Sequence, residues 1–468
     1  HITGTAADPI VEGRAHLWDG SAYGKLITNA FAKYNYKNER LELYRFDIEG
    51  YGATITGGGT VSKEAINIDF EGKKIDMGRL LINTDYKVDG LLAGRGTITG
   101  SMDNPQFNGY ILSDALSING QLLTDIHGHV YADKSVVNVQ DFSFAESNGG
   151  RYVAKGGMKL DDSKQLFGVL DVTNGSVKNL FALLDRADEH LDGQLNGSVE
   201  IGGTKDNPSV IVNGKINDVT IDDKVVGDAT IDASLANRKF KITTLKLPVG
   251  EGLIAMGGTL DLDGQAELQV ALKDVDIVPF LPLIGKDIQA TGWVTGVVNV
   301  TGETKNPKVE LSGAVESGSF NGIGIDEGFA LATMQDHVIQ IQRIQGAKGG
   351  YKLSIYGKIP LAALYTSGYL EASDAKSMDV TIDFNEADMA VIPLVTTSVK
   401  DATGPLKGAI RLTGTIDQPE AYGTVSVRNG TMKLANVDNE ITGIDGDLIF
   451  SGQQGDFQSR INMGKGSA

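Results

Sequence analysis

The chain has no cysteine among its 468 residues. Disulfide scaffolds, zinc ribbons, iron–sulfur proteins and thiol enzymes are therefore excluded. The absence of cysteine also fits an oxidising compartment such as a periplasm. No catalytic base or nucleotide-binding loop is evident, so the sequence predicts a protein that is not an enzyme and needs no cofactor.

Long apolar runs and blocks of positive charge are scarce as well. The longest nearly apolar stretch, residues 277–284, is broken by Pro279 and Pro282. It is far shorter than the ~20 residues that cross a bilayer, so no transmembrane segment is predicted in this sequence. The formal net charge is −18, from 42 basic and 60 acidic residues. This charge argues against nucleic acid as a partner.

Glycine, by contrast, is abundant: 60 of the 468 residues, about 13%, are glycine, against ~7% in an average protein. Five prolines share one setting, with a glycine five positions before them and another four or six positions after: Pro9, Pro105, Pro208, Pro307 and Pro419. A second series of glycines follows four of these prolines by 49, 52, 50 and 50 residues: Gly58, Gly157, Gly258 and Gly357. A polar residue and a proline between glycines form a turn, so each setting is predicted to join two strands.

The two series predict a repeat about one hundred residues long. We expect five repeats in one continuous array, the first and the last incomplete, at residues 1–95, 96–196, 197–295, 296–407 and 408–468. Between the landmarks apolar and polar residues alternate, which indicates one-faced strands. About six strands per repeat, joined by short connections, must run antiparallel. One short helix per repeat is predicted, near residues 75–82, 177–184, 277–284 and 389–395.

The apolar face of such strands has to be covered, because each leucine or isoleucine left in water forfeits about 1.5–3 kcal/mol. One short helix per repeat is too little to cover it, which excludes α/β and α+β folds. Three arrangements remain: tandem immunoglobulin-like sandwiches, a solenoid packed dry by its own side chains, or one sheet curled into a trough that a ligand fills. The only tryptophans, Trp18 and Trp293, occupy non-equivalent positions, unlike the repeated aromatic of tandem sandwich cores. The many alanines and few aromatics favour the trough.

Two candidate metal sites have simpler structural interpretations. His127 and His129 could share one face of a strand, but no further ligands lie near them in the sequence. Acidic clusters at residues 161–162, 222–223 and 261–263 are similar to calcium loops, yet they lack the EF-hand pattern. Hairpin turns explain these clusters, since aspartate and glycine favour such turns. No metal site is predicted.

One phrase carries a family resemblance. Residues 191–208 read Leu-Asp-Gly-Gln-Leu-Asn-Gly-Ser-Val-Glu-Ile-Gly-Gly-Thr-Lys-Asp-Asn-Pro and are followed by Val210, Val212 and Gly214. With the short helix predicted before it, this recurring phrase resembles the TamB family of the translocation and assembly module, within the AsmA-like group. That group is similar to the bridge-like lipid-transfer proteins built from repeating β-grooves.

The resemblance implies an all-β fold, an elongated antiparallel repeat sheet curled into a U-shaped hydrophobic groove, or β-taco, with one short helix per repeat. It implies a periplasmic conduit that carries phospholipid between the inner and outer membranes of a two-membrane bacterium, with the full-length protein anchored in the inner membrane. Phospholipid acyl chains are the expected partner, and TamA or another outer-membrane barrel is a partner of parts outside this sequence.

On this interpretation the acyl chains lie on the apolar stripes of the strands, at Ile66, Ile68, Phe70, Val137, Val139, Ala229, Ile231, Ala233, Leu235, Phe240, Ile242, Leu268, Val270, Leu272, Met378, Val380, Ile382 and Phe384. Two other functions stay open. A scaffold for outer-membrane β-barrel or autotransporter assembly with TamA would work by β-augmentation. A tandem-domain surface adhesin would have closed cores and no bound lipid.

Overall fold

The computed structural model describes residues 1–6, 8–22, 25–50, 52–80, 87–183, 190–204, 207–281, 289–320, 323–348, 351–364, 377–394, 398–415, 418–435, 440–463 and 466–467. Most of these residues are in strands, and the strand pairs are antiparallel. The chain divides into two compact units, His1–Arg238 and Lys239–Ala468. The predicted all-β, antiparallel class is therefore confirmed.

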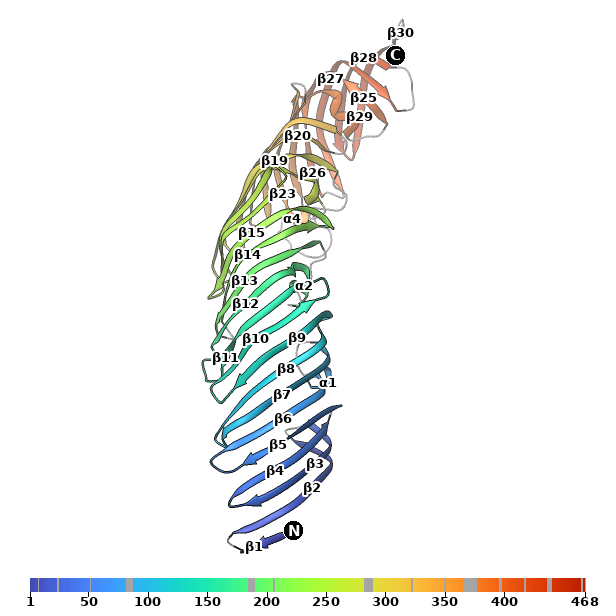
Figure 1. The fold of residues 1–468 in the computed structure, drawn as a ribbon. Helices are drawn as coiled ribbons and strands as arrows, with labels where there is room; N and C mark the ends of the chain where they lie inside the picture. Colours follow the sequence, from blue (N-terminus) through green and yellow to red (C-terminus); the bar gives the residue numbers. More distant parts are fainter. Residues whose placement is uncertain are drawn as a thin grey trace. The chain divides into compact units, whose positions relative to one another are not determined.

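The first unit is a ladder in which each strand pairs with the next one along the chain (Figure 1). Its strands are β1 (Ile2–Gly4), β2 (Pro9–Ala22), β3 (Lys25–Lys37), β4 (Arg40–Gly50), β5 (Ala53–Val61), β6 (Ile66–Asp76), β7 (Val88–Ser101), β8 (Asn104–Ile118), β9 (Gln121–Ala132), β10 (Val136–Glu146), β11 (Arg151–Lys159), β12 (Leu166–Ser176), β13 (Leu191–Gly203), β14 (Pro208–Ile221) and β15 (Lys224–Ala236). Two short helices follow β6 and β12: α1 (Met77–Leu80) and α2 (Val177–Leu183).

The second unit continues the same plan up to β24. Its strands are β16 (Lys239–Val249), β17 (Gly252–Asp261), β18 (Gln265–Asp276), β19 (Ala290–Glu303), β20 (Lys308–Phe320), β21 (Ile323–Gln335), β22 (Val338–Lys348), β23 (Tyr351–Pro360), β24 (Met378–Glu386), β25 (Val399–Thr403), β26 (Leu406–Gly414), β27 (Pro419–Leu434), β28 (Glu440–Gly452), β29 (Gln454–Met463) and β30 (Gly466–Ser467). Its helical segments are η1 (Val278–Phe280), α4 (Leu361–Leu364) and η2 (Met389–Leu394). Strand β24 pairs with β26, and β25 and β26 both pair with β27.

Glycine and proline close recurring hairpins. Gly100 pairs with Pro105 and Gly203 with Pro208, at the ends of β7–β8 and β13–β14. The two glycines have φ of +94° and +76°, a region that other residues rarely adopt. A Cβ atom at Gly100 would also lie 2.3 Å from the carbonyl oxygen of Asn104. The predicted strand–turn–strand junctions are therefore confirmed, and a positive φ explains the glycine in each of these two hairpins.

The short helices occur where the sequence predicts them. The structure has α1, α2, η1 and η2 within the predicted ranges 75–82, 177–184, 277–284 and 389–395; residues 81–82, 184, 282–284 and 395 of those ranges lie outside the described residues. Helix α4 was not predicted. All these segments are seven residues or shorter, so they cover only small areas of the sheet.

Much of the apolar face is left uncovered. The chain exposes 28167 Å² of surface, whereas a compact protein of this length exposes about 17,000 Å² and two compact domains of half the length about 20,000 Å². Among the described residues, 25 apolar side chains are buried. The main groups of them form four small clusters, each beside one short helical segment, through Met77, Val177, Ala363 and Met389.

Candidate functional site

Strand register places the predicted stripe residues of the first unit on one sheet face, because residues directly opposite each other in a ladder point to the same side. One row of paired residues runs through Phe70, Gly96, Gly109, Val130, Val139, Gly156, Gly168, Ile201, Val210 and Leu235. A neighbouring row runs through Ile68, Ile98, Phe107, Ala132 and Val137. Ile66, Ala229, Ile231 and Ala233 lie at alternate positions of the same strands and therefore on the same face.

The second unit has corresponding rows. One joins Ile242, Gly258, Leu268, Val300, Val309, Met334, Ile339 and Ile359. Another joins Leu272, Gly296, Gly313, Ala330, Ile344, Ile355, Ile382 and Ile410. Phe240, Val270, Met378, Val380 and Phe384 lie at alternate positions of these strands. Residues predicted from separate stretches of sequence thus form one apolar face within each unit.

The exposed fraction of the side chain differs among these stripe residues. Ala229, Met378 and Val380 are buried, and Phe240 is 40% exposed. The other fourteen predicted residues are partly exposed. A self-packed core would bury such residues almost completely, so most of this face has no close-packed cover within its own unit.

The opposite face of the second unit carries polar and charged side chains. The guanidinium of Arg411 donates two hydrogen bonds to Asp379, at 2.7 and 2.8 Å, which lower the pKa of that carboxyl group. The side-chain amide of Gln269 donates to Asn299 at 2.9 Å. The two faces of this sheet therefore differ in chemistry, and the apolar face is the candidate binding surface.

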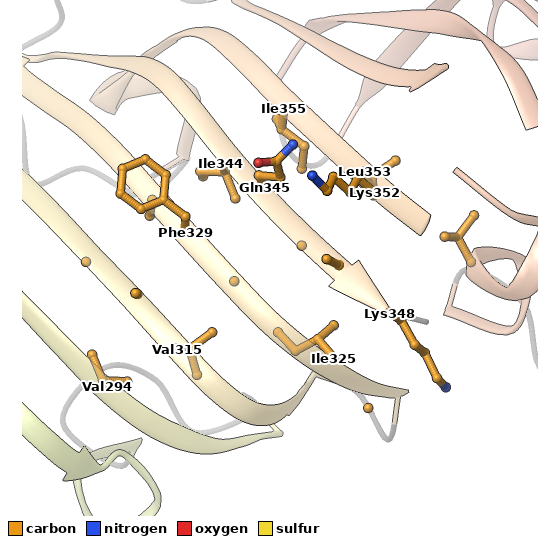
Figure 2. A pocket seen from close by; sticks show the side chains of 18 of the residues that line it. Val294, Val315, Ile325, Phe329, Ile344, Gln345, Lys348, Lys352, Leu353 and Ile355 are labelled. Carbon is orange, nitrogen blue, oxygen red and sulfur yellow. The ribbon is translucent and has the colours of Figure 1, made fainter. Parts of the chain in front are cut away.

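A pocket of about 850 Å³ opens on the apolar face of the second unit (Figure 2). Its aliphatic lining comes from strands β18 to β23 and from η2: Leu272, Val294, Val298, Leu311, Val315, Ile325, Ile344, Leu353, Ile355 and Val391. Pockets of about 300–1,000 Å³ with mainly apolar linings are typical of small-molecule sites. The pocket can therefore bury an apolar ligand, and its lining offers few groups that could orient a polar one.

Glycines enlarge the pocket. Gly296, Gly313, Gly328 and Gly346 line it and contribute no side chain. A Cβ atom at Gly328 would lie 2.6 Å from Cγ1 of Val315. A Cβ atom at Gly346 would lie 3.9 Å from Cγ2 of Ile325, which is ordinary contact distance. There is therefore room for a side chain at Gly346, whereas at Gly328 even a methyl group would clash with Val315.

Three charged residues line the same pocket: Lys348, Lys352 and Asp388. Asp388 is buried, and its two carboxylate oxygens accept hydrogen bonds from the backbone N–H groups of Ala390 and Gly404, at 2.9 and 2.8 Å. Lys348 is exposed, and its side chain extends past the end of β22 (Figure 2). Neither lysine forms an ion pair within the described part of the chain.

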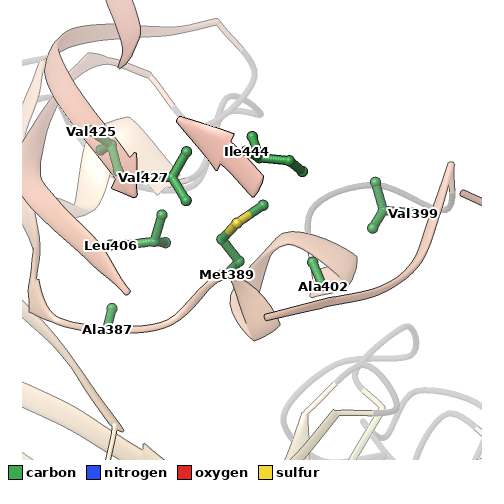
Figure 3. Packing of buried hydrophobic residues seen from close by; sticks show 8 residues of the cluster. All are labelled: Ala387, Met389, Val399, Ala402, Leu406, Val425, Val427 and Ile444. Atoms are coloured by element: carbon green, nitrogen blue, oxygen red, sulfur yellow. The ribbon is translucent and has the colours of Figure 1, made fainter. Parts of the chain in front are cut away.

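A smaller pocket of about 210 Å³ adjoins the first and shares Leu353 and Val391 with it. Phe384 and Met389 also line this smaller pocket. Beside it, the largest buried cluster packs Met389 of η2 against strands β25 to β28, as Figure 3 shows. The segment around η2 therefore covers the apolar face where the larger pocket ends.

Of the predicted stripe residues, Leu272 lines the larger pocket and Phe384 the smaller one. The sequence prediction missed most of the pocket, which is formed by β20 to β23. Alternating apolar residues at Val309, Leu311, Gly313 and Val315 were an available signal for β20. No signal marked Gly346, because its importance depends on its partner across the ladder, Leu353.

The other predicted candidates have structural roles. His127 is hydrogen-bonded to Ser143 at 2.8 Å through Nε2, and no group of three potential metal ligands occurs in the described ranges. Asp222 and Asp223, with φ of 46° and 63°, form the two-residue turn between β14 and β15, as the hairpin interpretation predicts. The carboxylate of Asp261 accepts a hydrogen bond from the backbone of Asp263 at 3.0 Å in another turn.

Comparison with protein-family models, with curated proteins and with solved structures finds no match for this chain. The resemblance to the TamB family therefore stays a prediction from the sequence. Among the described helices, none has the length and apolar character required to cross a membrane.

Proposed function

We propose that this chain binds lipid acyl chains along its apolar sheet face and, as part of a longer periplasmic protein, carries phospholipid between an inner and an outer membrane. In this proposal the sheet curls into a U-shaped groove, with lipid tails on the apolar rows and headgroups at the open mouth. The observation that supports it is the series of cross-strand rows whose aliphatic side chains stay partly exposed in each unit.

The energetics are consistent with a conduit. Each methylene group of a lipid tail that leaves water gains about 0.8 kcal/mol, and the rows present apolar side chains on successive strands. Since neighbouring strands offer similar apolar surfaces, a tail can move from one to the next without a large change in free energy. Transfer of this kind is diffusion along a strip and needs no catalytic group.

The proposal is tested with paired charge substitutions on one strand. Leu268→Asp places a carboxylate on the apolar row of β18, whereas Gln269→Asp places the same charge on the polar face next to it. We expect phospholipid bound to the purified chain, measured by native mass spectrometry after incubation with phospholipid vesicles, to fall with Leu268→Asp and to stay unchanged with Gln269→Asp. A wild-type chain that stays free of lipid under these conditions would contradict the proposal.

Ile231→Asp on β15 extends the same test to the first unit, with Thr230→Asp as its control on the opposite face of the sheet. In the full-length protein, these apolar-face variants should reduce lipid supply to the outer membrane while the fold survives. Normal supply in both would remove the conduit function from this surface.

The tandem-domain adhesin is disfavoured by the strand pairing. A sandwich domain needs two facing sheets with connections between them, whereas successive strands pair with their chain neighbours throughout the first unit and in the second unit up to β24. The assembly scaffold, which would use strand edges, has no specific observation in its favour.

A further inference from the structure

The pocket of the second unit differs from the rest of the apolar face because it has a defined end. Asp388 accepts hydrogen bonds from Ala390 and Gly404 and so fixes the start of η2, and Val391 of η2 forms part of the pocket wall. The backbone N–H of Met389 also donates to the carbonyl of Gly404 at 2.8 Å. A lipid tail lying on the rows would meet this anchored segment, so the pocket is a place for a ligand to stop.

The charges around the pocket distinguish one kind of headgroup. The chain carries a formal charge of −18, so its own field repels anionic ligands in general. Lys348 and Lys352 nevertheless line this apolar pocket, and within the described residues neither ammonium group forms an ion pair. Asp388 is also charged, but it is buried, and both of its carboxylate oxygens accept backbone N–H hydrogen bonds at the η2 end of the pocket. An ammonium group beside an apolar pocket complements a ligand with an anionic head and an apolar tail.

We propose that this pocket is a docking site for a phospholipid whose headgroup carries a net negative charge. The tail lies among Ile325, Ile344 and Leu353, over the space beside Gly346, and the phosphate lies at the rim near Lys348 with Lys352 as the second cation. This inference rests on the proposed binding of acyl chains and adds the headgroup class and one preferred site.

The headgroup assignment is tested by comparing two lipids with the same tails. Dioctanoyl phosphatidylglycerol carries a net negative charge and dioctanoyl phosphatidylcholine carries none. For the purified wild-type chain, we expect isothermal titration calorimetry to show about tenfold tighter binding of the phosphatidylglycerol, a difference of about 1.4 kcal/mol, because the two lysines attract a headgroup with a net negative charge. The double variant Lys348→Gln/Lys352→Gln should lose this preference and keep its affinity for phosphatidylcholine.

Lys358→Gln is the matched control, because Lys358 is an exposed lysine of β23 beside Asp379 and does not line the pocket. It should keep the wild-type preference. An unchanged preference in the double lysine variant would overturn the assignment of the headgroup. Failure of the wild-type chain to bind either lipid would overturn the proposed function itself.

The location of the tail is tested separately by filling the pocket. Gly346→Phe should abolish binding of both lipids at this site, and Gly346→Val, which adds less volume, should weaken it while the chain stays folded by circular dichroism. Full binding with unchanged stoichiometry in folded Gly346→Val and Gly346→Phe would place the lipid elsewhere and overturn the proposal.

Discussion

The hairpins β10–β11 and β22–β23 share a backbone plan but differ in what fills their apolar face. In each, a β-bulge separates a pair that contains a glycine at high positive φ from the pairs that follow. The next pairs are Phe142 with Ala154 and Phe144 with Tyr152 in the first hairpin. The equivalent pairs in the second hairpin are Ile344 with Ile355 and Gly346 with Leu353.

The outcome at the last pair is opposite in the two hairpins. The rings of Phe144 and Tyr152 stack with their centroids 4.6 Å apart, and Tyr152 is fully buried. Gly346 and Leu353 instead line the pocket of about 850 Å³. We call β10–β11 the plugged hairpin, because the rings of Phe144 and Tyr152 fill this position, and β22–β23 the open hairpin. The side chains at one cross-strand pair therefore distinguish two hairpins of the same plan, so an apolar row alone does not determine whether a ligand can enter.

The plugged hairpin also contains a satisfied polar contact. The hydroxyl of Tyr152 donates to Glu146 at 2.6 Å, and the other carboxylate oxygen of Glu146 accepts from the backbone N–H of Ser176 at 3.1 Å. Burial raises the pKa of Tyr152, and the hydrogen bond to Glu146 raises it further. This contact ties β11 to the start of α2, so the aromatic plug and the short helix stabilise each other.

The largest expected effect comes from removing the plug. Tyr152→Ala should destabilise the first unit by about 3–5 kcal/mol, because it deletes a fully buried ring and leaves Glu146 with one partner fewer. Leu353→Ala at the equivalent position should lower the free energy of unfolding of the second unit by clearly less, because Leu353 is only partly buried and already borders the pocket. Urea unfolding followed by hydrogen exchange in each unit measures both. Equal losses in the two variants would contradict the difference between plugged and open hairpins.

The next effect tests what the two hairpins share. Gly357 in β23 has φ of +142°, and a Cβ atom there would lie 2.2 Å from the carbonyl oxygen of Asp379. Gly357→Ala should therefore cost about 1–3 kcal/mol from backbone strain, with the steric clash in addition. Gly156→Ala in β11, with φ of +152° and the same 2.2 Å approach to Phe167, should behave alike.

Gly346→Ala is the control for these glycine variants, because its Cβ atom would meet nothing closer than 3.9 Å. It should leave stability unchanged or raise it by up to about 1 kcal/mol through the unfolded state. The three variants are compared by their urea midpoints. A Gly346→Ala loss as large as that of Gly357→Ala would show that the space beside Gly346 is required by the fold.

A smaller effect isolates the polar contact of the plug. Tyr152→Phe keeps the ring and its stacking on Phe144 but removes the hydrogen bond to Glu146, so we expect a loss of about 1–2 kcal/mol. Thermal unfolding by calorimetry measures it. The companion variant Tyr131→Phe removes a hydrogen bond to Asp133 that is only partly buried, and it should change the midpoint far less. If Tyr152→Phe and Tyr131→Phe lowered the midpoint of thermal unfolding equally, the buried hydrogen bond to Glu146 would contribute no more than the one to Asp133.

Much of this fold follows from the sequence, but its open and closed regions do not. Alternating apolar residues and the glycine–proline settings predict the strands and hairpins, because both signals act within a few residues. The β-bulges at Lys74, Asn174 and Asp274 have φ of 56°, 53° and 48°. Because a different residue type occupies each of these positions, the sequence does not predict where the bulges lie.

The pocket could not be predicted for a related reason. Phe144 and Gly346 occupy equivalent places only once the ladder register is known, and register depends on bulges that the alternation does not show. The predicted stripe residues share one sheet face in each unit. The difference between a filled and an empty cross-strand pair, however, arises from contacts across strands that the alternation does not show. Helix α4 was missed because one helical segment per repeat was expected, and the repeat 296–407 contains both α4 and the predicted η2.

The smallest effect concerns the turns that lead into the two hairpins. Hydrogen bonds from the hydroxyl and the backbone N–H of Ser135 lower the pKa of Asp133, in the turn before β10, to about 2. Because the folded pKa lies below the ordinary value of 3.8 for an aspartate, this turn is stabilised above pH 4 and loses that contribution as the pH falls through about 2.

An NMR titration of the Asp133 carboxyl group measures this pKa, and Ser135→Ala should raise it toward the ordinary value by removing the hydroxyl donor. The turn before β22 contains Asp336 and His337, with φ of 50° and 60°. It is a two-residue turn, and the carboxylate of Asp336 accepts one hydrogen bond, from the side-chain amide of Asn306 at 2.7 Å. The carboxylate of Asp133 accepts four. Lowering the pH from 4 to 2.5 should therefore destabilise the turn before β10 more than the turn before β22. Hydrogen exchange over this pH range would show the difference as faster exchange in β10 than in β22. Faster exchange in β22 would mean that the pocket, and not the turn, decides which hairpin opens.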